Sequence, residues 1–93
     1  MYLEIGEFHD ALEAARRATM CDPEFEEGHR IVARIMIVIG EYERAIASLK
    51  QCLHLNDDEP IYYWWLSTVC VKLGRNAAAS LYAREARRLE GGA

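Results

Sequence analysis

The sequence predicts an all-α fold built from helix pairs, and three observations lead to this expectation. Apolar residues recur at helical spacing along much of the chain. β-Branched residues are scattered among the strong helix formers Ala, Leu, Glu and Arg, and there are only two prolines. Short motifs also return at a regular interval. With 93 residues, the chain is expected to form one small domain.

The composition argues against several classes of protein. Hydrophobic residues make up 52% of the chain and charged residues 28%, which is typical of a folded domain. The net charge of −4 disfavours nucleic-acid binding, because that activity is associated with a basic surface. No apolar run approaches a membrane span, and the first residues lack the pattern of a secretory signal. We therefore expect a cytoplasmic protein that neither binds nucleic acid nor inserts into a membrane.

The repeat period is carried by glycines and by small residues at fixed distances after them. The interval from Gly6 to Gly40 equals the interval from Gly40 to Gly74, and we call this interval one period. Asp22-Pro23 also returns one period later, in altered form, as Asn56-Asp57. The repeated positions are Gly6, Gly40 and Gly74, then Ala11, Ala45 and Ala79, and then Ala18, Cys52 and Ala86.

The elements follow in order from this period. A first helix is reduced to a stub of about five residues, and Gly6 is expected in the turn after it. The apolar pattern over 31–39 predicts a helix that ends at Gly40, and the pattern over 45–53 predicts one that stops before Asn56. The last helix is expected from about Asn76 to Glu90. The units are then a partial repeat over 1–24 and two repeats over 25–58 and 59–91.

These residues resemble the tetratricopeptide repeat (TPR) family. The middle unit supplies Val32, Ala33, Met36, Gly40, Tyr42, Ala45, Leu49 and Cys52. The last unit supplies Tyr63, Leu66, Ser67, Cys70, Gly74, Ala79 and Ala86, with Asn76 in place of the turn aromatic. The first unit supplies Tyr2, Gly6, Phe8, Ala11, Ala18 and Pro23. The resemblance implies a right-handed helix-turn-helix solenoid of about 2.5 repeats, with about five helices and a shallow concave face.

No catalytic or metal-binding motif is apparent. The histidines are expected in a turn (His9), at a helix start (His29) and at a helix end (His54), and so do not share one face. Three cysteines at wide spacing do not suggest a disulfide framework, and we expect buried structural thiols at Cys21, Cys52 and Cys70. We therefore predict no enzyme activity, no metal and no cofactor.

Two segments are more apolar than a surface helix requires. Residues 31–39 contain one charged residue, Arg34, so this helix is expected to be buried on more than one side. Four consecutive aromatic residues, 62–65, sweep about 300° around a helix and cannot all enter one core. Tyr63 is expected in the core, Trp64 in the groove, and Trp65 or Tyr62 on another side. These rings either thicken the packing or anchor a partner.

The predicted function is protein binding, as a scaffold or chaperone that holds a helical or extended segment of a partner protein in a mainly apolar groove. The resemblance implies that the groove is lined by Arg30, Arg34, Ile37 and Val38 from the middle unit. From the last unit it implies Ile61, Trp64, Thr68, Val71 and Lys72. Arg30 and Arg34 provide two cations of the carboxylate clamp found in some TPR domains, but the asparagines of that clamp are lacking.

Two alternatives are kept open. One is a structural protomer that forms homo-oligomers through uncapped ends. Residues 1–28 carry a net charge of −6 and residues 61–93 carry +3, so Arg84, Arg87 and Arg88 would meet the acidic end of another copy. The other alternative is a chaperone of needle or translocator subunits, because residues 65–74 resemble part of the TPR-like chaperones of type III secretion.

Overall fold

The structure, a computed structural model, describes residues 5–91 of the chain, with side chains from Phe8 onward. These residues form five α-helices and contain no strand, which confirms the predicted all-α class and helix number. The helices are α1 (Ile5–Cys21), α2 (Glu26–Ile39), α3 (Tyr42–Leu55), α4 (Pro60–Lys72) and α5 (Asn76–Gly91).

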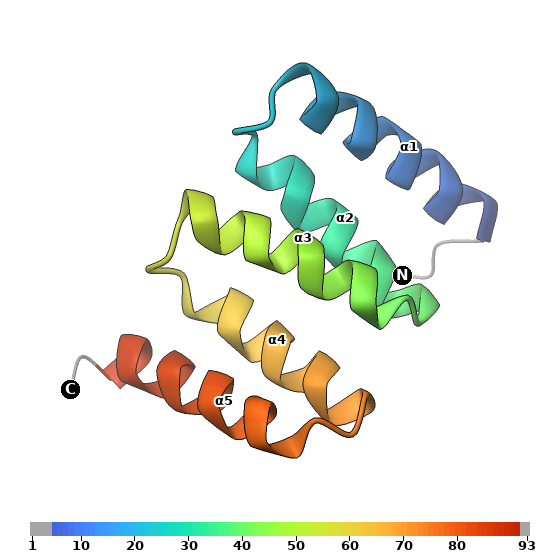
Figure 1. Ribbon diagram of the computed structural model, residues 1–93. Coiled ribbons are helices and arrows are strands. Elements are labelled where there is room, and N and C mark those ends of the chain that lie inside the picture. The colour runs from blue at the N-terminus through green and yellow to red at the C-terminus, as the bar shows by residue number, and fades with distance from the viewer. Residues whose placement is uncertain (1–4, 92–93) are drawn as a thin grey trace.

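The helices are stacked in chain order. Each helix from α2 to α5 packs against the helix that precedes it. Consecutive helices run in opposite directions, and α1 and α5 lie at the two ends of the stack (Figure 1). Within residues 5–91, α2, α3 and α4 therefore have helical neighbours on both sides, whereas α1 and α5 have one strongly packed neighbour each.

Two turns that lie one period apart are built in the same way. Gly40 and Gly74 end α2 and α4 with φ angles of 85° and 76°, in the left-handed region that favours glycine. The residue after each glycine donates its amide to a carbonyl five residues earlier, over 2.8 Å in both cases. The connections after α1 and α3 also match, because Asp22 and Asn56 each accept the amide of the residue two positions later.

The prediction for Gly6 is wrong. Gly6 lies inside α1, as does His9, which was expected in the same turn. Glycine tolerates helical dihedral angles at a cost of about 1 kcal/mol, so its presence does not impose a turn. Tyr2 and the rest of the expected stub up to residue 4 lie outside the described residues.

The core is centred on α2, α3 and α4. One cluster joins Val32 and Met36 of α2 to Ala45 of α3 and Val69 of α4. A second cluster joins α2, α3 and α4 through Ala33, Leu49, Cys52, Tyr62 and Leu66, all without exposed surface. The repeated small residues at 45, 52, 79 and 86 are buried, as a close approach of helices requires.

Two core predictions need correction. Tyr62, not Tyr63, is the fully buried aromatic residue of α4. Cys52 and Cys70 are buried as expected, but Cys21 is exposed because it ends α1 at the outer end of the stack. Among residues 5–91, no helix combines the length and the apolar character that crossing a membrane would demand.

Candidate protein-binding surface

Side chains of α2 and α4 enclose an open hollow of about 190 Å³, which we call the α2–α4 groove. Ile37 and Val38 lie about one helical turn after Arg34 on α2, so each is close to Arg34 on the helix surface. Trp65 and Thr68 complete the lining from α4. The Thr68 hydroxyl donates to the Trp64 carbonyl within its own helix, over 3.0 Å. The lining is therefore apolar except for one cation and a hydroxyl that already has an acceptor.

Four of the nine predicted binding residues line this groove: Arg34, Ile37, Val38 and Thr68. The other five lie outside its lining. Ile61, Val71 and Lys72 are exposed on α4. Arg30 is half-buried and lies 3.8 Å from the carboxylate of Glu27 in the same helix.

Trp64, the fifth, is placed differently from the prediction. The tryptophan beside the α2 residues is Trp65, whereas the Trp64 ring lies 5.9 Å from the guanidinium carbon of Arg87 on α5. Tyr62, not Tyr63, takes the core position of α4, whereas Thr68 does line the groove. The differences at residues 62–65 are therefore not a single rotation of the helix. Tyr63 lies near Tyr82 of α5, with ring centroids 6.4 Å apart.

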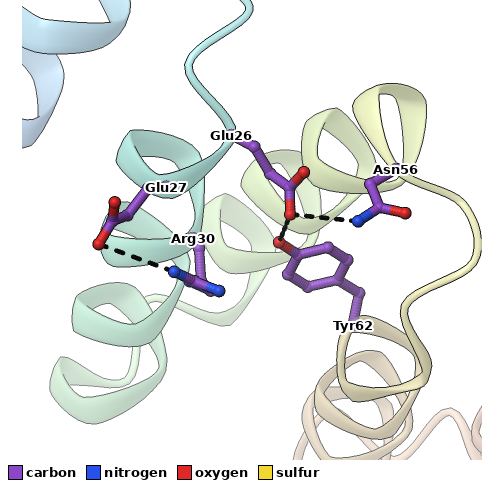
Figure 2. Close-up of polar contacts among 5 residues, drawn as sticks. All are labelled: Glu26, Glu27, Arg30, Asn56 and Tyr62. Atoms are coloured by element: carbon purple, nitrogen blue, oxygen red, sulfur yellow. Dashed lines mark hydrogen bonds and ion pairs between the residues drawn. The ribbon is translucent and has the colours of Figure 1, made fainter.

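A polar contact that the sequence did not reveal joins α2, α4 and the residue that follows α3. Figure 2 shows the Glu26 carboxylate of α2 accepting the hydroxyl of Tyr62 from α4. The same carboxylate oxygen lies 3.5 Å from the amide nitrogen of Asn56, which follows α3. Burial, and then the bond to Glu26, raise the pKa of Tyr62 and keep its hydroxyl protonated as a donor. This contact links the start of α2 to the start of α4 and to the end of α3.

The groove has the chemistry of a recognition surface for apolar side chains. Arg34 is the only charged residue in its lining, and it has no ion pair among the side chains described from residue 8 to 91. An apolar floor with one exposed cation suits a partner segment that carries apolar residues and a carboxylate. No group of His, Cys, Asp and Glu side chains within the described part could hold a metal ion.

The three arginines predicted for self-association are all exposed on α5, but two of them have contacts within the chain. Arg88 pairs with Glu85 one turn away, and Arg87 lies over Trp64. The ion pair with Glu85 offsets the charge of Arg88, whereas Arg87 keeps its charge beside Trp64.

Comparison with known proteins gives no family assignment. No family model matches this chain, and no curated protein matches it.

Proposed function

We propose that this chain is a TPR-type helical-repeat module that binds a helical or extended segment of a partner protein in the α2–α4 groove. The repeat assignment is supported by two glycine turns of the same geometry, Gly40 and Gly74, one period apart. It is also supported by the helix starts, because α4 begins one period after α2 and α5 begins one period after α3.

The observation that carries the binding proposal is the composition of the groove. Val38 exposes 62% of its surface beside Ile37, Trp65 and the exposed cation of Arg34. Soluble proteins gain little from an exposed aliphatic side chain, whereas aromatic and arginine side chains contribute strongly to binding energy at interfaces. The partner segment is expected to place aliphatic side chains against Val38 and Trp65 and a carboxylate near Arg34.

The test is co-purification of partners with the tagged chain and with the variant Thr68→Glu. The new carboxylate in the groove repels an acidic partner segment, so we expect the bound protein to be lost. Leu81→Glu is the matched control, because Leu81 is 62% exposed on α5 and lies outside the groove. Circular dichroism should show equal helicity for both variants. A partner retained by Thr68→Glu, or lost equally from both variants, would contradict the proposal.

The two alternatives predict different measurements. A self-assembling protomer has a mass in solution above 10.6 kDa that falls when Arg84, Arg87 and Arg88 are changed to Glu, and light scattering detects this directly. A chaperone of secreted subunits is a special case of the proposed function, and the identity of the co-purified partner decides it.

A further inference from the structure

A second apolar surface lies at the α1 end of the stack and adjoins the α2–α4 groove, with which it shares Arg34 and Val38. Two adjoining hollows between α1 and α2, of about 160 and 410 Å³, share Phe8, Ile35 and Val38. We call their combined lining the α1–α2 trough. Its remaining residues are His9, Ala11, Leu12, Ile31, Arg34 and Ile39.

The same molecule contains a filled counterpart of this trough. Helix α2 packs into the groove between α3 and α4, where its Val32 and Met36 share a cluster with Ala45 and Val69. Tyr42, Ile46 and Leu73 pack against the same cluster. Met36 is only 1% exposed there, so the groove is closed by the helix that occupies it.

The residues of the filled groove map onto the trough at a constant distance of one period. All five counterparts line the trough, and all five are apolar or small. Tyr42, Ala45, Ile46, Val69 and Leu73 correspond to Phe8, Ala11, Leu12, Ile35 and Ile39. The trough is thus built like a surface that takes a helix, and among residues 5–91 no helix lies in it.

Residues 1–93 do not supply that helix. Helices α2 to α5 are already packed in the stack, and four residues precede Ile5. Four helical residues rise only about 6 Å. Helix α2, which fills the counterpart groove, has 14 residues. A helix of comparable length has to come from outside these residues.

Charge distinguishes the trough from its filled counterpart. Arg34 lines the trough at the position where α4 has Thr68. It is exposed and has no ion pair among the described side chains of 8–91. A cation at the edge of an apolar trough favours an occupant with a carboxylate at that point.

We propose that the α1–α2 trough is a docking site for an amphipathic α-helix of a partner protein. The helix presents apolar side chains four residues apart, as Val32 and Met36 do in α2, and a carboxylate toward Arg34. The trough and the α2–α4 groove share Arg34 and Val38, so the experiment relies on Ile39, which lines the trough alone, to separate this inference from the proposed function.

The test uses a synthetic, fluorescently labelled peptide with the sequence of α2 as the probe. Ile35, Val38 and Ile39 are replaced by Gln in the peptide, because these residues of α2 face α1, and Arg34 is replaced by Glu. Fluorescence anisotropy with the 93-residue chain should show saturable binding. A control peptide that also carries Val32→Gln and Met36→Gln should bind at least about tenfold more weakly, because it lacks the two buried side chains.

Variants of the chain locate the site. Ile39→Gln, at a position that is 46% exposed in the trough and outside the α2–α4 groove, should weaken binding about tenfold or more. Leu81→Gln on α5 should leave binding unchanged. Binding without saturation, or binding insensitive to Ile39→Gln, would overturn the proposal; the latter result means that the peptide displaces α2 from its own groove. A homodimer that Ile39→Gln converts to a monomer would also overturn it, because a second copy then covers the trough.

Discussion

The two ends of the helix stack differ in the residues that stand at the positions a neighbouring helix would cover. At the α1 end these positions remain apolar and form the trough. At the α5 end, Ala83 and Arg87 stand one period after Leu49 and Leu53, which belong to the α3 side of the second core cluster. The α5 end has thus replaced two leucines by a small and a charged residue.

Two polar side chains at the α5 end also form contacts within the chain. Ser67 stands one period after the buried Ala33, and its hydroxyl donates to the Ala79 carbonyl over 2.8 Å. Arg87 lies over the ring of Trp64. The equivalent positions of the period are therefore occupied by apolar residues at the α1 end and by small or polar residues at the α5 end.

The largest expected effect is a difference in stability between a substitution in the filled groove and one in the trough. Met36→Ala removes a side chain that is 1% exposed and leaves a cavity, so the free energy of unfolding should fall by about 3 kcal/mol. Ile39→Ala at the trough, where the side chain is 46% exposed, should cost about 1 kcal/mol or less. Urea unfolding followed by circular dichroism measures both values. Equal losses of unfolding free energy in the two variants would contradict the assignment of one groove as filled and the other as open.

The next effect concerns the buried thiol of α3. Burial first, and then the charge of Glu26, raise the pKa of Cys52 from 9.0 to about 11. Between these pH values the thiol of the unfolded chain loses its proton while the thiol of the folded chain keeps it. The free energy of unfolding therefore keeps the full contribution of Cys52 below pH 9 and loses it as the pH rises toward 11. The loss should be on the order of 2 kcal/mol by pH 11.

Unfolding measured in reductant at pH 8 to 11 tests this dependence. The slope should become shallower in Cys52→Ala than in the parent chain. The raised pKa of Tyr62 leaves a residual slope above pH 10 in the variant. An unchanged slope in Cys52→Ala would show that burial does not raise the pKa of the Cys52 thiol.

The smallest effect compares two glycines at equivalent positions of the period. Gly40→Ala should lower the free energy of unfolding by about 1 kcal/mol, because φ is 85° there. The added methyl meets no atom within 4 Å, so the cost comes from the backbone alone. Gly6→Ala should leave stability unchanged or raise it by up to about 1 kcal/mol, because Gly6 lies in a helix. Thermal unfolding of both variants gives the comparison, and a matching loss in Gly6→Ala would contradict the assignment of Gly6 to α1.

Much of the fold was predictable because local chemistry determines it. Gly40 and Gly74 could be identified as turns, since the apolar pattern of a helix runs up to each of them. Gly6 lies between Ile and Glu, as Gly40 does, but has only five residues before it, and a glycine alone does not distinguish a turn from a helix interior. The regular spacing of the glycines therefore predicted equivalent positions without determining that each has the same conformation.

The α2–α4 groove was only partly predictable. Arg34, Ile37 and Val38 were expected from the pattern of α2, where one charged residue marks the exposed side. In α4 the residues 61–66 are all apolar or aromatic, so no polar residue defines which of them face the groove. Trp64 was therefore expected in the groove, where the structure has Trp65. The α1–α2 trough was missed because it requires knowing which helices lack a neighbour.

The most direct test of the difference between the two ends is a nuclear magnetic resonance titration of the isotopically labelled chain with the α2-derived peptide. We expect the methyl signals of Leu12, Ile35 and Ile39 to shift progressively and to saturate, while signals of Leu81 and the rest of the α5 end stay in place. Shifts concentrated at the α5 end, or no saturable shift at the α1 end, would contradict the account.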